Sequence, residues 1–271
     1  MSQDPASPFG AVAEPKPELR QELQYLRMYR YVFENPNWAT NFGWSMLALA
    51  SQAIIPFVGN FVLLGYLYEM VESLHRNPHR MYPDFDINRF TDYLSRGIWP
   101  FLVSLIVSIP MAGVFMMCYF GGMIGTIVAV ESESEAVQMG MAILIPVVIL
   151  LVFGLVLLLN MITVPFMLQA GLARNLSTDG GLCFRRVRQF MKLTWKELLL
   201  GSLFLSVTAI PLFFAGLACC YVGVFAVGPW ITFAGTHMQY QLYEIFLARG
   251  GEPIPLPQPP QPPQFVTADL A

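Results

Sequence analysis

Residues 137–170 read VQMGMAILIPVVILLVFGLVLLLNMITVPFMLQA, a stretch without a single charged side chain. About 20 apolar residues are enough to cross the hydrocarbon core of a bilayer, which is about 30 Å thick. Three further stretches are comparably apolar: Ile98–Val130, Leu198–Ala218 and Tyr221–Phe246. The sequence therefore predicts an all-α fold, a polytopic transmembrane helical bundle with four firm spans.

The composition of the whole chain supports a membrane environment. Hydrophobic residues make up 55% of the 271 residues and charged residues only 12%, about half of the charged share of a soluble domain. Much of the surface must therefore face lipid. The net charge of −3 leaves no basic excess for neutralising phosphates, which excludes nucleic acid as a partner.

A fifth apolar stretch, Phe42–Tyr68, is interrupted in its middle by Pro56-Phe57-Val58-Gly59-Asn60. Proline removes a backbone donor, and glycine loosens the turn. The pattern predicts either one bent span or a re-entrant pair of half-length helices that enter and leave on the same side. Pro56, Gly59 and Asn60 are the candidate helix break or gate.

The positions of the basic residues predict the orientation in the membrane. Lysine and arginine gather before residue 41, between residues 76 and 96, and after Ala170, whereas the loop Glu131–Glu135 has none. Basic loops stay in the cytoplasm. We therefore expect a multi-pass protein of the cell membrane with its basic loops and C-terminus in the cytoplasm. A re-entrant hairpin at 42–68 keeps the basic N-terminal segment on that side.

The expected organisation has four parts. Residues 1–17 form a disordered, Pro-rich N-terminus, and residues 18–40 an amphipathic cytoplasmic segment. Residues 41–252 form the membrane domain, and residues 253–271 a disordered, Pro-rich tail. Such a tail adopts extended polyproline structure and serves as a spacer or docks onto a protein partner.

A basic amphipathic helix is expected after the apolar stretch at residues 137–170. Phe184, Val187, Met191 and Trp195 recur at helical spacing. Around them lie the candidate lipid- or partner-binding residues Arg185, Arg186, Arg188, Lys192 and Lys196. Apolar residues of such a helix dip toward the acyl chains while basic residues meet anionic headgroups. Alternatively, the helix only leads into the next span and holds it in place.

The sequence contains a polar row but no recognisable catalytic, cofactor-binding or metal-binding residues. His237, Gln241 and Glu244 share one face of the last stretch. They line a wet cavity, bind a cation, or pack against neighbouring helix ends, and packing is the simplest reading. Glu72, His75 and His79 offer metal-ligand side chains, but Pro78 interrupts their helix, which favours a solvated helix end.

Several motifs resemble a known family. They are Met81-Tyr-Pro-Asp-Phe-Asp86, Phe90-Thr-Asp-Tyr-Leu-Ser-Arg-Gly97, Gln239-Tyr-Gln-Leu-Tyr243 and Arg249-Gly-Gly-Glu252. Together with the break at Pro56–Asn60, they resemble the bacterial integral-membrane family of domain of unknown function 4013. The resemblance covers roughly residues 41–252. It implies a membrane fold and supplies no catalytic residues, because the family has no established activity.

Three functional hypotheses follow from these features. The leading one is a non-enzymatic membrane component that binds membrane lipids, or a protein partner, at its cytoplasmic face through the basic helix or the tail. The second is a permease for an apolar or lipid-like substrate, with the break at Pro56–Asn60 as its gate. The third is a metal-dependent membrane enzyme that uses His75, His79 or His237.

Overall fold

The computed structural model describes residues 19–77, 81–132, 134–178, 181–219 and 222–257. Their regular secondary structure is helical except for one hairpin of two two-residue strands, β1 (Ser177–Thr178) and β2 (Gly181–Leu182). The α-helices are α1 Tyr25–Arg30, α2 Trp38–Ala50, α3 Val58–Arg76, α4 Phe90–Glu131, α5 Glu135–Ala173, α6 Phe184–Ala218 and α7 Val222–Ala248. Short 3₁₀ helices are η1 Tyr31–Glu34, η2 Ser51–Ala53 and η3 Ile87–Arg89.

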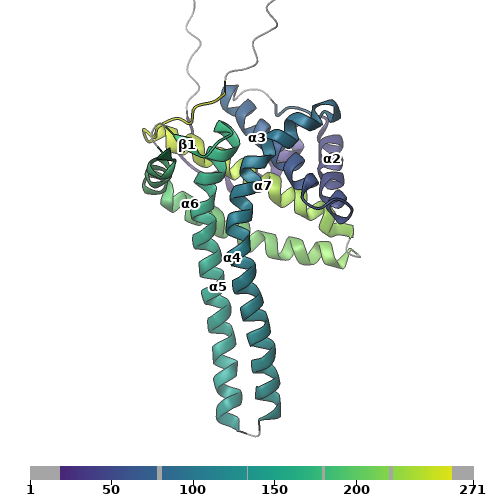
Figure 1. The fold of residues 1–271 in the computed structure, drawn as a ribbon, viewed down its shortest axis with the longest axis vertical. Helices are drawn as coiled ribbons and strands as arrows, with labels where there is room; N and C mark the ends of the chain where they lie inside the picture. Colours follow the sequence, from purple (N-terminus) through teal and green to yellow (C-terminus); the bar gives the residue numbers. More distant parts are fainter. Residues whose placement is uncertain (1–18, 78–80, 133, 179–180, 220–221, 258–271) are drawn as a thin grey trace, which may run out of the picture.

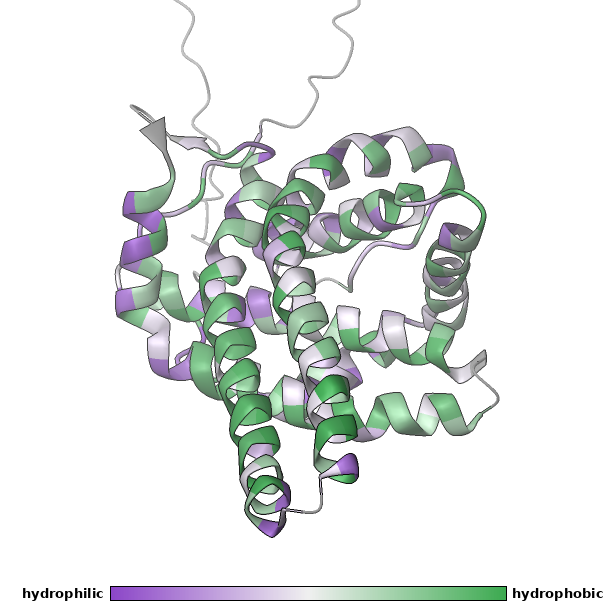
Figure 2. Cartoon of the chain, turned by 60° about the horizontal axis from the view of Figure 1, so that its bottom comes forward, coloured by the Kyte–Doolittle hydropathy of each residue, from purple (hydrophilic) through white to green (hydrophobic). Residues whose placement is uncertain are grey.

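The molecule consists of a packed part and one long helical hairpin (Figure 1). We call the packed part the head; it is formed by α1, α2, α3, α6, α7 and the bases of α4 and α5. Helices α4 and α5 run side by side and project far beyond the other helices. They contain 42 and 39 residues, so at 1.5 Å per residue each is about 60 Å long. None of the described residues from Ser104 to Asn160 is buried. Because most of these side chains are apolar (Figure 2), the projecting part of the hairpin requires a lipid environment.

Three helical segments, not four, are long and apolar enough to cross a membrane within the described residues: Ile87–Glu131, Glu135–Ala173 and Phe184–Ala218. The prediction of a fourth firm span at Tyr221–Phe246 is therefore corrected. That stretch forms helix α7, whose second half carries His237, Gln239 and Gln241 and lies largely buried in the head. Its apolar residues contribute to the protein core, which hydropathy alone does not distinguish from lipid contact.

The break at Pro56–Asn60 separates two helices. Helix α2 passes into η2, and α3 begins at Val58 after Phe57, whose φ of 71° lies in the left-handed region. A β-carbon on Gly59 would stand 1.7 Å from the Ala48 carbonyl oxygen. The amides of Gln52 and Asn60 donate to each other's oxygen, both at 3.0 Å. The two helices thus meet closely, and the polar group of Asn60 already has a partner within the chain.

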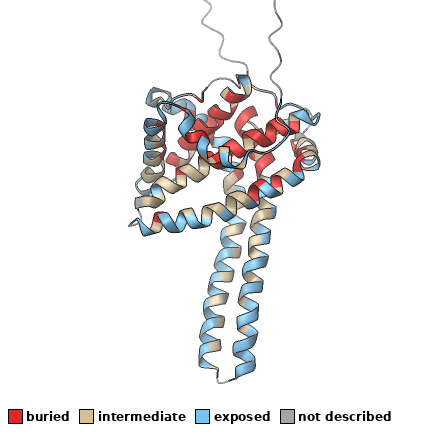
Figure 3. Cartoon of the chain, turned by 180° about the vertical axis from the view of Figure 1, so that it is seen from behind, coloured by how far each residue is buried: buried red, intermediate tan, exposed pale blue. Residues whose placement is uncertain are grey.

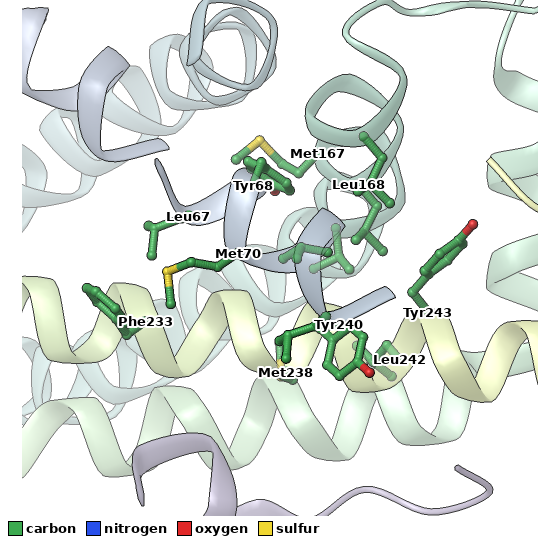
Figure 4. Packing of buried hydrophobic residues seen from close by; sticks show 14 of the residues in the cluster. Leu67, Tyr68, Met70, Met167, Leu168, Phe233, Met238, Tyr240, Leu242 and Tyr243 are labelled. Atoms are coloured by element: carbon green, nitrogen blue, oxygen red, sulfur yellow. The ribbon is translucent and has the colours of Figure 1, made fainter. Parts of the chain in front are cut away.

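The core lies in the head, around helix α3. Buried residues gather there, whereas the projecting hairpin is exposed or half-buried (Figure 3). Leu67, Tyr68 and Met70 of α3 lie between Leu168 of α5 and Phe233 of α7 (Figure 4). Burying a large apolar side chain stabilises a fold by about 1.5–3 kcal/mol. The head is therefore held together by contacts between elements far apart in the sequence.

Glycines allow α3 to contact its neighbours at backbone distance. A β-carbon on Gly97 would stand 1.8 Å from the Phe61 carbonyl oxygen, and one on Gly171 would stand 2.1 Å from the ring of Tyr68. Close approach through small residues is the usual way in which membrane helices gain packing contacts. These contacts fix the bases of α4 and α5 against the head.

Candidate functional site

The first half of α6 exposes most of the predicted basic residues. The side chain of Arg185 is 89% exposed, although its Nη2 lies 3.2 Å from Glu252 Oε2. Arg188, Lys192 and Lys196 are exposed as well. Their spacing of three or four residues places them on one helical face. We call these four residues the basic face.

Arg186 differs from the other four predicted residues because it points into the protein. Its side chain is 11% exposed. Its Nη1 donates to Gln169 Oε1 at 2.6 Å, and its Nη2 lies 3.4 Å from Glu252 Oε1. Arg186 therefore links α6 to α5 and to the chain after α7, and it is not available to a ligand at the surface.

The apolar residues of the same helix also fall into two groups, one buried and one exposed. Val187 is buried in the head, whereas Phe184 and Trp195 are 60% and 49% exposed. We expected the whole apolar row to dip toward acyl chains, and for Val187 this is wrong, because it packs against the protein. Trp195 lies beside the basic face, with Lys196 Nζ 5.6 Å from its ring centroid.

The exposed stripe of α6 changes its chemistry along the helix. After Lys196 the exposed positions continue at the same spacing with apolar residues: Leu200, Leu203, Val207, Ile210 and Phe214. One continuous stripe is thus cationic in its first half and apolar in its second. With this stripe facing the bilayer, the basic residues would lie among the lipid headgroups and the apolar residues against the acyl chains.

The predicted polar row of α7 lies inside the head. His237, Gln241 and Glu244 are 2%, 0% and 6% exposed. Gln241 accepts the Gln24 backbone N–H at 2.7 Å and lies 3.1 Å from His237 Nδ1. The ring of Tyr31 stacks on His237 at 4.2 Å. The first two residues of the row thus pack against the N-terminal segment.

Glu244 completes this contact. Tyr240 Oη donates to its Oε1 at 2.6 Å, and Arg20 Nε lies 2.9 Å from its Oε2. Burial raises the pKa of Glu244, while burial and the charges of Arg20 and Arg27 lower the pKa of His237 to about 3. The imidazole is therefore neutral near pH 7, and the row acts as a hydrogen-bonded junction between α7 and residues 20–31.

The acidic residues at the end of α3 bind arginines. Glu72 accepts from Arg76 at 2.8 Å and from Arg96, whose side chain is only 5% exposed. Although burial opposes ionisation, the charge of Arg96 and the bonds from both guanidiniums hold the pKa of Glu72 below its ordinary value. Within the described residues no three His, Cys, Asp or Glu side chains gather as metal ligands; His79 lies outside them.

A second carboxylate site, at Asp84, was not predicted from the sequence. Asp84 accepts hydrogen bonds from the side-chain amides of Asn35, Asn37 and Asn41, at 3.0, 2.7 and 3.0 Å. These bonds, led by that of Asn41, lower the pKa of Asp84. The three asparagines occur within seven residues of one another, and this spacing was the only available signal. The Asp84 site ties the start of α2 to the segment before α4.

The chain after α7 folds back over the head. Of the predicted tail at residues 253–271, the structure describes residues 253–257. Ile254 is 6% exposed, and its backbone N–H donates to Tyr243 Oη at 2.8 Å. Ile254 lines a cavity of about 10 Å³ together with Gln169 and Arg186, room for about one water molecule. We call residues 252–257 the C-terminal strap.

The exposed apolar part of the α4–α5 hairpin requires lipid, and it projects from a packed head. These features define the chain as a helical membrane protein. It belongs to the family described as protein of unknown function (DUF4013), which matches residues 48–221. Comparison with curated proteins found no match, and neither did comparison with solved structures. The family assignment agrees with the resemblance of the motifs and brings no activity with it.

Proposed function

We propose that this protein is a non-enzymatic membrane component whose head binds anionic lipid headgroups through the basic face of α6. The observation that carries the proposal is the exposed stripe of α6, which turns from cationic to apolar between Lys196 and Leu200. Each basic residue near an anionic membrane surface contributes about 1 kcal/mol of attraction. Arg188, Lys192 and Lys196 beside the exposed Trp195 suit an anionic headgroup layer. Arg185 adds to them although its guanidinium also contacts Glu252, because its side chain is 89% exposed.

The proposed orientation places the head, the basic loops and the C-terminus in the cytoplasm of the cell. It is supported by the charges at the two ends of the α4–α5 hairpin. Arg89, Arg96 and Arg174 lie at its base, whereas Glu131 and Glu135 lie at its far end. Positive charge is retained on the cytoplasmic side.

Quenching of Trp195 fluorescence tests the proposal. Purified protein is titrated in detergent with brominated phosphatidylglycerol or brominated phosphatidylcholine, and a Trp195→Phe variant isolates the signal of Trp195. We expect stronger quenching by the anionic lipid. Combined Arg188→Gln and Lys192→Gln replacement should weaken its apparent affinity about tenfold or more.

A matched control removes two charges elsewhere on the head. Arg27 and Arg89 are paired with Glu34 and Glu69, so Arg27→Gln with Arg89→Gln should leave the lipid preference unchanged. Equal quenching by both lipids would refute the proposal. If an acidic protein instead co-purifies with the parent chain and is lost from the Arg188→Gln, Lys192→Gln variant, the basic face binds that protein partner.

A further inference from the structure

We infer that, among the described helices, only the α4–α5 hairpin crosses the bilayer, and that the tips of two shorter hairpins, α6–α7 and α2–α3, enter only the leaflet next to the head. The surface formed by these two tips is then a binding surface for a single leaflet. This inference rests on the proposed membrane insertion and orientation of the chain, and it is independent of which headgroup the basic face prefers.

Helix α6 is held to the N-terminal segment near its middle. Tyr29 Oη lies 2.5 Å from Thr208 Oγ1, and the Trp230 indole N–H donates to the Tyr29 carbonyl oxygen at 3.1 Å. Tyr29 belongs to α1, a helix that also carries Arg27 and exposed Arg30. Because these charges stay near water, Thr208 and Trp230 must also lie close to the membrane surface.

The remaining length of α6 is too short for a crossing. From Thr208 to Ala218 the helix advances about 15 Å at 1.5 Å per residue, half of the roughly 30 Å hydrocarbon thickness. Helix α7 returns from Val222 to Trp230 over a similar distance. In Figure 1, α6 and α7 accordingly run across the base of the α4–α5 hairpin and not alongside its projecting part.

The α2–α3 hairpin is also too short to cross the bilayer. The start of α2 is fixed to the head by Asn41 and Asp84, and its 13 residues span about 20 Å. Its tip presents Ile54 and Phe57, which are 84% and 53% exposed. The mutual Gln52–Asn60 amide pair satisfies polar groups near this tip, as a lipid environment requires.

The two tips belong to one surface. A β-carbon on Gly228 of α7 would stand 3.2 Å from Leu49 Cδ1 of α2, so the hairpins pack against each other. Beyond this contact α6 and α7 expose Ile210, Phe214 and Phe225 at 51%, 64% and 43%. The acyl chains of one leaflet are the occupant that suits this apolar surface, because it lies on the side of the head from which α4 and α5 project.

The α4–α5 hairpin is different because none of its described residues from Ser104 to Asn160 is buried by the head. From Ser104 to Glu131, α4 extends about 40 Å at 1.5 Å per residue, which exceeds the hydrocarbon thickness. Its end and the start of α5 carry the acidic residues Glu131 and Glu135. These residues can therefore reach water on the far side of the membrane.

Labelling from one side of sealed vesicles tests the inference. All four cysteines are replaced by serine, and single cysteines are then placed at Ser134, in the far loop, at Asp92, on the head, or restored at Cys219, at the end of α6. A membrane-impermeant maleimide is added to vesicles in which position 134 faces outward. We expect position 134 to be labelled and position 92 to be protected until the vesicles are opened.

Position 219 gives the deciding result. If the α6–α7 hairpin enters only the near leaflet, Cys219 is protected from the face that labels position 134 and reacts fully after detergent solubilisation. Labelling of Cys219 from that face, at a rate similar to position 134, would mean that α6 and α7 cross and would overturn the inference. The result does not depend on lipid charge, so it is distinct from failure of headgroup binding.

Discussion

Gly65 of α3 lies against the backbone of Tyr93 in α4, and a β-carbon on Gly65 would stand 1.9 Å from the Tyr93 carbonyl oxygen. A real β-carbon at that distance overlaps the oxygen, and the backbone of α4 cannot yield as a flexible side chain can. The contact positions the base of the crossing hairpin on the head, and it requires glycine for space.

Replacing Gly65 by Ala should therefore destabilise the head. Forcing an extra carbon into a packed interface costs about 1–3 kcal/mol or more, which a thermal unfolding experiment in detergent measures. Gly113→Ala in the outer part of α4 is the control, since nothing lies within 4 Å of a β-carbon there. Equal melting temperatures for the two variants would contradict this view of the α3–α4 contact.

Arg96→Gln should destabilise the protein more than Arg89→Gln. Arg96 is almost completely buried against Glu72 and the Tyr68 carbonyl oxygen, and breaking a buried ion pair costs about 3 kcal/mol or more. The Arg89 side chain is 44% exposed beside Glu69, and exposed pairs contribute at most about 1 kcal/mol. Chemical denaturation of both variants measures the difference, and a reversed order would refute it.

The Asp84 site should make stability depend on acidity. Its hydrogen bonds lower the folded-state pKa of Asp84 below an unfolded value of about 3.9. The stabilisation is therefore complete above that value and is lost as the pH falls through the folded-state pKa. Asp84→Asn should melt at a lower temperature than the parent at pH 7, and the gap should narrow below about pH 4.

The matched control for this pH experiment is Asp92→Asn. The Asp92 side chain is 71% exposed, so its replacement should have little effect at either pH. A gap between parent and Asp84→Asn that widens on acidification would show that the asparagine amides do not favour the ionised carboxylate.

Ile254→Ala should release the C-terminal strap. Removing a buried isoleucine side chain costs about 2–5 kcal/mol, and part of this cost should appear as local opening. Hydrogen exchange of residues 252–257 should therefore be faster than in the parent. Ile87→Ala is the control, because Ile87 is 49% exposed. Unchanged exchange in the Ile254→Ala strap would show that Ile254 does not hold it.

The sequence predicted features that depend on local chemistry. The break at Pro56 was recognised because proline and glycine interrupt a helix wherever they occur. The partner of Asn60 was not predicted, because the choice of Gln52 depends on how the turn closes. The helical spacing of His237, Gln241 and Glu244 placed them on one face without indicating what covers it.

Hydropathy misled where apolar residues are buried by protein. Phe233 and Phe246 of α7 are 1% and 0% exposed within the head, yet on a hydropathy scale they contribute as if they faced lipid. The basic helix posed a related problem. Arg186 and Arg188 have the same charge, but only the fold shows that Arg186 points toward Gln169 while Arg188 faces outward.

The junction between α7 and the N-terminal segment also constrains how the chain is made. Gln24 and Gln241 are 217 positions apart, so Gln24 leaves the ribosome long before its partner exists. Meanwhile the α4–α5 hairpin, whose two helices are neighbours in sequence, can already enter the membrane. Because non-local contacts form late, the N-terminal segment must wait beside the membrane until translation of α7 is complete, and only then can the head close.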